Sequence, residues 1–306
     1  MNKSLIPIFF VTLALAAAGA VAAAPEHVEL PKGDSMLLPL DAGVSARMIY
    51  VTTGTLASHP GRPPIFLIDQ DGSPWLASRG NILLDLMKES LIVVDPKFDD
   101  VALFEDGTFV LCADGAMGSL VEASPEQKRK NKYSMAFRPR LKLPYKKMRI
   151  FEGENGTIYL VGKNPKDGKN ELFTATDDGR GRKNIVKLVA VQEPIDSVAG
   201  DGGTTYFSSG PLVVKVGPDR KKMEGYLKLA PENAIRQLAY SSKAGLFFTT
   251  AKGVGFVGEK DPQMFLHAPD ASIRIRKNSL FVLFTKEQDV LEIDGIAGYG
   301  KLLGRR

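Results

Sequence analysis

The feature of this sequence that most constrains its fold is a proline that recurs ahead of short, strand-like runs. In the last three copies a branched apolar residue stands four positions after the proline, and the earlier copies keep this spacing to within one residue. Proline has no backbone N–H to donate and is found at strand ends rather than in strand interiors. The prolines divide the chain into six repeats, which begin at Pro39, Pro96, Pro144, Pro194, Pro231 and Pro269.

Each repeat can supply four short strands. In the fifth repeat, apolar strands are predicted over residues 235–240, 245–250 and 253–257, and a fourth over 264–267 precedes the next proline. Four short strands in a repeat of about 40 residues are typical of a propeller blade. The chain is therefore predicted to be all-β, a six-bladed β-propeller with four-stranded antiparallel blades. A pair of stacked sheets, as in a β-sandwich, is the alternative fold.

A lone blade cannot bury both of its faces, so we expect the blades to pack in a closed ring. The apolar runs within Glu26 to Leu40 precede the first full repeat, and we expect this segment to pair near the C-terminal repeat and close the ring. The residues predicted on the innermost strands are Val101, Val198, Ile235 and Ile273.

Two segments carry helical signals. Residues Gly80 to Leu91 place apolar side chains at a helical spacing. Ser124 is followed by proline and, three residues on, by Gln127, which predicts a capped helix start. Both helices are expected as insertions that decorate the ring.

The N-terminus has the pattern of a secretory signal peptide over residues 1–24. Lys3 supplies a positive start, an apolar run follows, and small residues favour cleavage after Ala22 or Ala23. An uncleaved anchor is the alternative. We expect residues 25–306 to form one propeller domain without a transmembrane segment, in the periplasm or secreted.

The proline spacing, with a glycine and an aromatic residue in the strands that follow, resembles the NHL, YVTN and gluconolactonase-like (strictosidine-synthase-like) superfamily of six-bladed propellers. In the lactonase-like branch, acidic and asparagine side chains at the central channel hold a divalent cation. That resemblance would place a Ca²⁺ site on Asp99, Asp196, Asn233 and Asp270, which could equally be turn residues.

The sequence offers little material for other catalytic chemistry. The chain has one cysteine and three histidines, so cysteine-rich metal sites are excluded. Cys112 ends the apolar run from Phe109 and is expected to be a buried small residue rather than a nucleophile. We identify no catalytic residue.

A basic segment stands out from residue 128 to residue 149, with ten cations and no acid in a chain of net charge +5. Charged and apolar residues alternate near Pro139, which indicates an edge strand. The segment is either a docking surface for an anionic partner or an edge that charge protects from strand pairing. Its cations are Lys128, Arg129, Lys130, Lys132, Arg138, Arg140, Lys142, Lys146, Lys147 and Arg149.

These observations favour a non-catalytic, exported propeller that acts as a binding or assembly module in the cell envelope, without a cofactor. The expected partner is an envelope protein or an anionic membrane or polysaccharide surface, and nucleic acid is not expected. The alternative is a lactonase- or hydrolase-like enzyme with a divalent cation in its channel.

Overall fold

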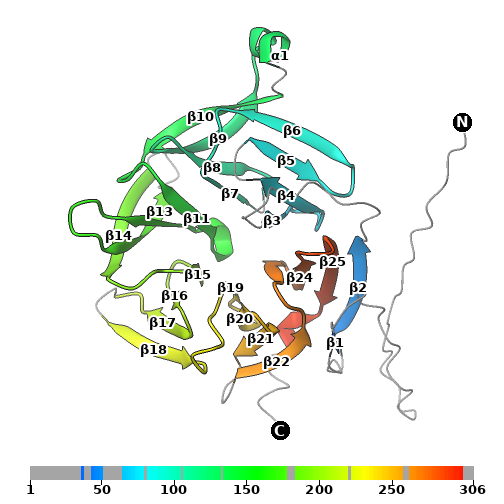
Figure 1. Ribbon diagram of the computed structural model, residues 1–306, viewed down its shortest axis with the longest axis vertical. Helices are drawn as coiled ribbons and strands as arrows, with labels where there is room; N and C mark the ends of the chain where they lie inside the picture. The colour runs from blue at the N-terminus through cyan, green and yellow to red at the C-terminus, as the bar shows by residue number, and fades with distance from the viewer. Residues whose placement is uncertain are drawn as a thin grey trace, which may run out of the picture.

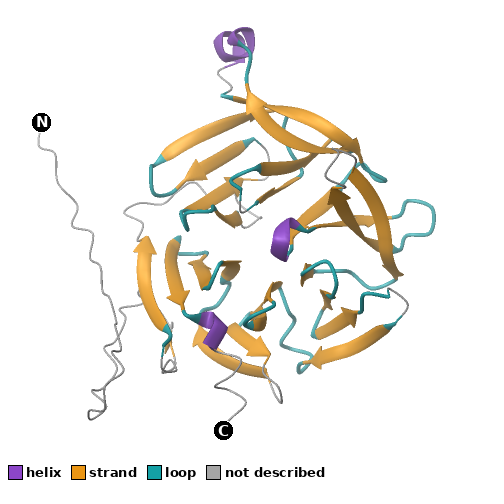
Figure 2. Cartoon of the chain, turned by 180° about the vertical axis from the view of Figure 1, so that it is seen from behind, coloured by secondary structure: helices purple, strands orange, loops and turns teal. Residues whose placement is uncertain are grey.

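The computed structural model describes residues 36–37, 43–50, 64–78, 81–104, 106–131, 134–177, 183–219, 222–257 and 262–298. Its strands form six blades around a central channel (Figure 1), and two short 3₁₀ turns and one helix interrupt the strands (Figure 2). The fold is therefore the predicted six-bladed β-propeller. The expected signal peptide, residues 1–24, and Pro39 lie outside the described residues.

In every blade the strands follow one another outward from the channel, each antiparallel to the next. Blades 1 and 2 comprise β3 (Ile65–Ile68), β4 (Pro74–Ser78), β5 (Ile82–Asp85) and β6 (Ser90–Asp95), then β7 (Asp100–Leu103), β8 (Phe109–Ala113), β9 (Ala116–Glu122) and β10 (Met135–Lys142). Blades 3 and 4 comprise β11 (Met148–Glu152), β12 (Ile158–Lys163), β13 (Asn170–Asp177) and β14 (Lys183–Val191), then β15 (Ser197–Gly200), β16 (Thr205–Ser209), β17 (Leu212–Val216) and β18 (Met223–Lys228).

The last two blades also take strands from the start of the chain. Blade 5 comprises β19 (Gln237–Ser241), β20 (Gly245–Thr250), β21 (Gly253–Val257) and β22 (Pro262–His267), with β1 (Met36–Leu37) added outside. Blade 6 comprises β23 (Ser272–Arg276), β24 (Ser279–Phe284), β25 (Asp289–Asp294) and β2 (Ser45–Tyr50).

The hydrophobic core is divided into six clusters, one between each pair of neighbouring blades. Strand β24 shows how the sequence produces this division, because successive side chains point to opposite faces of a strand. Its Leu280 and Val282 pack toward blade 5, whereas Phe281 and Leu283 pack toward blade 1. A blade therefore needs apolar residues on both faces, which explains why whole strands rather than alternate positions are hydrophobic.

Side chains on the inner strands satisfy the backbone of the neighbouring inner strand. The inner strand of each blade has one edge without a strand partner in its own blade, and its buried N–H groups need acceptors. Asp100 Oδ2 accepts a hydrogen bond of 3.1 Å from the Ile150 N–H, and Ser197 Oγ accepts one of 2.9 Å from the Leu238 N–H. Gln237 Oε1 accepts one of 2.6 Å from the Ile273 N–H. These contacts fix the spacing of blades around the channel.

Five of the six predicted repeats begin a blade, and the first does not. The residues after Pro39 lead into β2, the outermost strand of blade 6, and blade 1 begins instead at β3, directly after Pro64. Three of the four residues predicted on innermost strands lie there. The exception is Ile235, which is buried but precedes β19 by two residues.

The chain start closes the ring, although mainly through a later segment than predicted. Within Glu26 to Leu40, Met36 and Leu37 pair antiparallel with β22 of blade 5. The strand that completes blade 6 is β2, which pairs antiparallel with β25 and brings buried Ala46 into the core between blades 5 and 6. Figure 1 shows β2 beside β25 at the outside of the ring.

Of the two predicted helices, one is confirmed and one is wrong. Helix α1 (Pro125–Asn131) begins as expected, because the Ser124 N–H donates to Gln127 Oε1 (2.9 Å) and the Gln127 N–H donates to Ser124 Oγ (3.2 Å). Residues 80–91 instead contain β5, a turn and the start of β6. The side chain of Asp85 accepts hydrogen bonds from the N–H groups of Met87 and Lys88, which makes the turn.

We predict that a charge in the closing strand destabilises the ring. Ala46→Asp places a carboxylate between blades 5 and 6 and should lower the free energy of unfolding by about 3 kcal/mol. Thermal and chemical denaturation followed by circular dichroism measure the change. Lys228→Asp, at an exposed position on the outer strand of blade 4, is the control and should change stability little. Equal stability of the two variants would contradict a closing role for β2.

Candidate functional site

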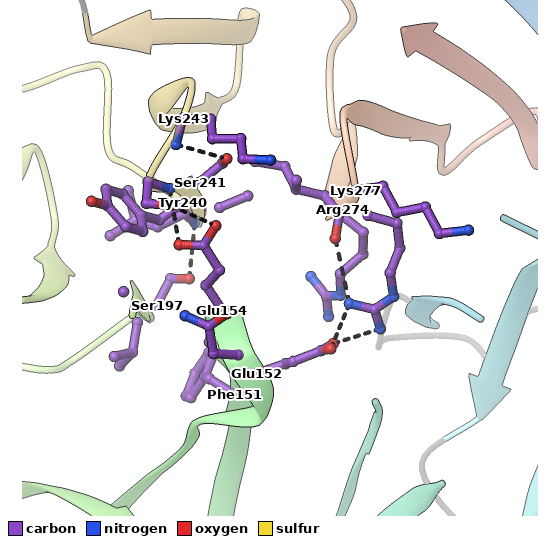
Figure 3. A pocket seen from close by; sticks show the side chains of 18 of the residues that line it. Phe151, Glu152, Glu154, Ser197, Tyr240, Ser241, Lys243, Arg274 and Lys277 are labelled. Atoms are coloured by element: carbon purple, nitrogen blue, oxygen red, sulfur yellow. Dashed lines mark hydrogen bonds and ion pairs between the residues drawn. The ribbon is translucent and has the colours of Figure 1, made fainter. Parts of the chain in front are cut away.

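A cavity of about 450 Å³ lies in the channel at the ends of four inner strands. We call it the channel cup. Its walls are the C-terminal parts of β11, β15, β19 and β23 and the turns that follow three of them (Figure 3). Ser197 and Leu238 are buried at its floor, whereas Ser242, Lys243 and Lys277 are exposed at its rim. The cup therefore opens to solvent, and its volume is in the range of small-molecule sites.

The charge of the cup is positive. Four cationic side chains line it, against two carboxylates. Those groups are Lys243, Arg274, Arg276 and Lys277, with Glu152 and Glu154 as the acids.

Arg276 connects several blades across the channel. Its side chain is 7% exposed and forms a two-point ion pair with Glu152 of blade 3, with contacts of 2.5 and 2.9 Å. Its remaining donors reach the carbonyl oxygen of Ile68 in blade 1, at 3.0 Å, and that of Leu103 in blade 2. A side chain of blade 6 thus joins three other blades across the axis.

Arg274 lies two residues earlier on the same strand, on the same side as Arg276, and points into the cup (Figure 3). Burial lowers the pKa of its guanidinium, although the charge of Glu152 opposes this shift. One of its hydrogen bonds runs from Nη1 to the carbonyl oxygen of Ile273, at 2.9 Å. Arg274 forms no ion pair with another residue that the structure describes.

Glu154 forms one side of the rim. It follows β11 in a 3₁₀ turn (Glu154–Gly156), and its carboxylate accepts two hydrogen bonds of 2.9 Å from the backbone N–H and the hydroxyl of Ser242 in blade 5. This contact spans blade 4 at the mouth of the channel (Figure 3). Both carboxylates of the cup therefore already have partners.

The alternation of Ile273, Arg274, Ile275 and Arg276 was the signal in the sequence for these residues. Ile273 and Ile275 pack on the core between blades 5 and 6, so the two arginines point to the other face of β23, and both line the cup. Arg274 and Arg276 were not predicted as site residues, because they match no motif of catalysis or metal binding.

The residues that resemblance suggested for Ca²⁺ do not line the cup. They precede the inner strands, whose C-terminal ends form the cup, and so lie away from its rim. Asp270 forms an ion pair with Arg236, and Asp196 accepts a hydrogen bond of 2.8 Å from the Gly210 N–H. Asp99 and Asn233 lie in equivalent loops. Within the described part of the chain, no three His, Cys, Asp or Glu side chains are grouped to hold a metal ion.

The basic segment spans three different environments. Lys128 and Arg129 are exposed on α1, which projects from the ring (Figure 1). Arg138, Arg140 and Lys142 are exposed on the outer strand β10. Lys146 and Lys147 are exposed in the loop toward blade 3, while Lys132 and the side chain of Lys130 lie outside what the structure describes.

Arg149 belongs to the interior. Its guanidinium donates to the carbonyl oxygens of Ile195 and Asp196 in blade 4 and lies 5.1 Å from the centre of the Phe151 ring. It joins β11 to the loop before β15 and is not available to a surface partner.

The predicted edge strand around Pro139 is β10. Its first two residues, Met135 and Ala136, pair in parallel with β6 of blade 1, and this pairing ends at Ala136. A bulge follows Pro139, and Phe137 and Leu141 pack on the cores to either side of blade 2. The apolar side chains thus lie on both faces of β10 and not on one face, because the bulge interrupts the alternation, while Arg138, Arg140 and Lys142 are exposed.

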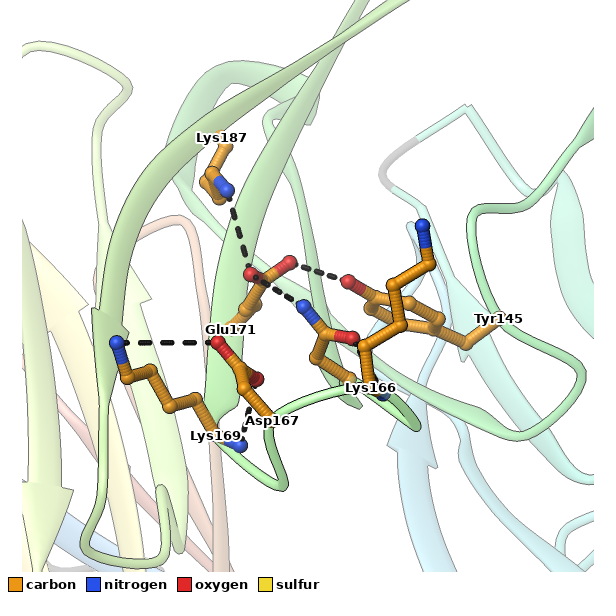
Figure 4. A network of polar contacts seen from close by, with 7 residues as sticks. Tyr145, Lys166, Asp167, Lys169, Glu171 and Lys187 are labelled. Atoms are coloured by element: carbon orange, nitrogen blue, oxygen red, sulfur yellow. Dashed lines mark hydrogen bonds and ion pairs between the residues drawn. The ribbon is translucent and has the colours of Figure 1, made fainter.

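A second polar cluster surrounds Glu171 in blade 3 (Figure 4). Its buried carboxylate accepts hydrogen bonds from the Tyr145 hydroxyl (2.5 Å), Asn164 Nδ2 (3.3 Å) and Lys187 Nζ (3.2 Å). Burial alone would raise the pKa of Glu171, but these donors lower it below its ordinary value. Burial and the neighbouring carboxylate raise the pKa of Tyr145 to about 12. With the acceptor oxygens of Glu171 occupied, this cluster is a structural tie between two loops and two strands.

Cys112 is buried as predicted, and burial raises the pKa of its thiol far above the ordinary value. It therefore has the character of a core residue and not of a nucleophile.

No protein-family model and no curated protein sequence matches this chain. Among solved structures, a gluconolactonase from Xanthomonas campestris aligns with 10% sequence identity over 85% of this chain and 95% of its own, with a TM-score of 0.55. A streptogramin B lyase aligns with 15% identity over 78% of this chain and 95% of its own, with a TM-score of 0.47.

The extracellular domain of BT4673 from B. thetaiotaomicron aligns with 14% identity over 87% of this chain and 40% of its own, with a TM-score of 0.47. At these identities the gluconolactonase supports the propeller fold alone. Among the described residues, no helix has the length and apolar character needed to cross a membrane.

We predict that Arg276 and Glu152 stabilise the fold as a pair. Removing one partner leaves a buried charge uncompensated, so Arg276→Met and Glu152→Gln should each lower the free energy of unfolding by about 3 kcal/mol or more. The double variant should lose clearly less than the sum of the two, because neither charge of the pair is left without the other. Chemical denaturation of the four proteins provides the cycle, and additive losses would show that the pair is not coupled.

The Glu171 cluster should stabilise the protein only above acidic pH. A carboxylate whose pKa is lowered by folding contributes stability above its unfolded pKa, near 4.5, and loses it as pH falls through the folded value. Glu171→Gln should therefore cost about 1–3 kcal/mol at pH 7, and the cost should shrink below about pH 4.5. Urea denaturation between pH 7 and pH 3 tests this, with exposed Glu232→Gln as the control. A cost independent of pH would contradict it.

Proposed function

We propose that this chain is a non-catalytic binding or assembly module of the cell envelope, exported by its N-terminal segment. Its docking surface consists of the seven described and exposed cations of the basic segment, on α1, β10 and the loop that follows β10. The partner is an anionic surface of the envelope, either a membrane or a polysaccharide or protein that carries acidic groups.

The observation that supports this proposal is the placement of charge on blade 2. Arg138, Arg140 and Lys142 lie on the outermost strand, whose apolar side chains already pack inward. None of the three forms an ion pair with another described residue. Unpaired cations on a rigid outer strand create a local field that extends about 8 Å at physiological salt. Such a field attracts anionic surfaces.

The alternative function is a lactonase- or hydrolase-like enzyme with a divalent cation in the channel. A fold like that of the gluconolactonase is compatible with it. The four candidate ligands give it less support, because Asp270 is engaged with Arg236 and Asp196 with the Gly210 N–H. The positive charge of the channel cup is also unlike an acidic cation site.

The proposal predicts that binding depends on the β10 cations. Each lysine or arginine near an anionic membrane contributes about 1 kcal/mol, so replacing Arg138, Arg140 and Lys142 by serine should weaken binding roughly a hundredfold at low salt. Co-sedimentation with phosphatidylserine–phosphatidylcholine vesicles, and titration with dextran sulfate, measure this across a salt series. Binding by the unaltered protein should fall steeply as salt rises.

The control removes the same charge elsewhere on the surface. Lys97, Lys228 and Lys286 are exposed and lie outside the basic segment, and their triple replacement by serine should leave most of the binding intact. Thermal midpoints of both triple variants should stay close to that of the unaltered protein, because exposed substitutions change stability little. If both triple variants bind equally well, or the unaltered protein binds neither probe, the docking surface is not where we place it.

A further inference from the structure

The channel cup contains positive charge that is not needed to hold the blades together. Arg276 is fully engaged with Glu152 and with two carbonyl oxygens, and it accounts for the closure of the channel. Arg274 is different, because a guanidinium has five N–H donors and its hydrogen bond to the carbonyl oxygen of Ile273 takes one of them. Placing a cation with spare donors in a partly buried channel costs stability.

The carboxylates of the cup offset its cations only in part. Glu152 is paired with Arg276, although its charge also favours the charged form of Arg274. Glu154 accepts hydrogen bonds from the neutral donors of Ser242 and leaves one negative charge against the other cations of the cup. At the rim, Lys243 and Lys277 are exposed, and neither forms an ion pair with another residue that the structure describes. The three remaining cations therefore surround a cavity of about 450 Å³ that is open to solvent.

We propose that the channel cup binds a small anion, a phosphate or carboxylate compound, with Arg274 as its central ligand and Lys243 at the rim. The planar fork of a guanidinium matches two oxygens of either group and forms charge-assisted hydrogen bonds with them. The lysine adds a point charge without fixed geometry. This site is separate from the docking surface on blade 2, and the proposal does not depend on that function.

The geometry of the rim limits the size of the ligand. Glu154 and Ser242 are joined across the mouth, between blades 3 and 5, so the cup is narrowed on that side (Figure 3). Phe151 and Tyr240 form part of the wall and can contact an apolar portion of the ligand. A small molecule that carries its negative charge at one end fits this arrangement better than a polymer.

Isothermal titration calorimetry of the purified protein with inorganic phosphate and with citrate tests the proposal, at ionic strength held constant with potassium chloride. We expect saturable binding of at least one probe, and the preferred probe identifies the class of ligand. Arg274→Gln should weaken that binding at least tenfold, and Lys243→Ser about threefold, because each removes a charged donor.

Two controls keep the result interpretable. Lys228→Gln removes an exposed cation outside both the cup and the docking surface and should leave affinity unchanged. Lys243 is exposed, so Lys243→Ser tests the site even if Arg274→Gln lowers the thermal midpoint. The proposal is overturned if neither probe binds at millimolar concentrations, or if binding is the same in Arg274→Gln and Lys243→Ser as in the unaltered protein. Loss of vesicle binding by the β10 variant with anion binding retained would show that the two sites are independent.

Discussion

Every blade of this propeller has two apolar faces, and only a closed ring covers all of them. The six clusters of the core each lie between two neighbouring blades. At about 25 cal/mol per Å² of buried apolar surface, exposing even one such interface would cost a large part of the stability of an ordinary protein. The arrangement of the chain ends follows from this constraint, because β2 must leave the start of the sequence and complete the last blade.

Closure around an axis creates a second requirement, at the inner strands. Their inward edges cannot be covered by further strands, so side chains must supply acceptors and donors. Asp100, Ser197 and Gln237 do this between neighbouring blades, and Arg149 does it through carbonyl oxygens. Arg276 does the same across the channel, because it donates to the carbonyl oxygen of Ile68 and pairs with Glu152. The polar character of the channel is thus a consequence of the fold, and only groups in excess of this need are candidates for a ligand.

The sequence predicted the architecture because the repeat is local. A proline, an apolar strand and a glycine-containing turn recur within about 40 residues. These signals can be recognised in the sequence without knowledge of distant contacts. The first repeat was misplaced for the opposite reason: the segment after Pro39 is apolar like an inner strand, but its partner, β25, lies about 240 positions away in the sequence. The helix predicted over residues 80–91 failed because Asp85 forms a turn that an apolar spacing does not reveal.

The site could be predicted less well than the fold. The arginines of the basic segment and of the channel cup show the reason. Counting charge along the chain grouped Arg138 with Arg149, yet one is exposed on an outer strand and the other bonds to carbonyl oxygens inside the ring. Conversely, Arg274 stands in the sequence in a short group with Arg276 and Lys277, much less conspicuous than the ten cations of the basic segment. Only the assembly of four inner strands brings it together with Lys243 of another blade. In this propeller, the basic segment runs from the outer strand of blade 2 to the inner strand of blade 3, whereas the charged groups of the cup come from inner strands and turns of blades 3, 5 and 6.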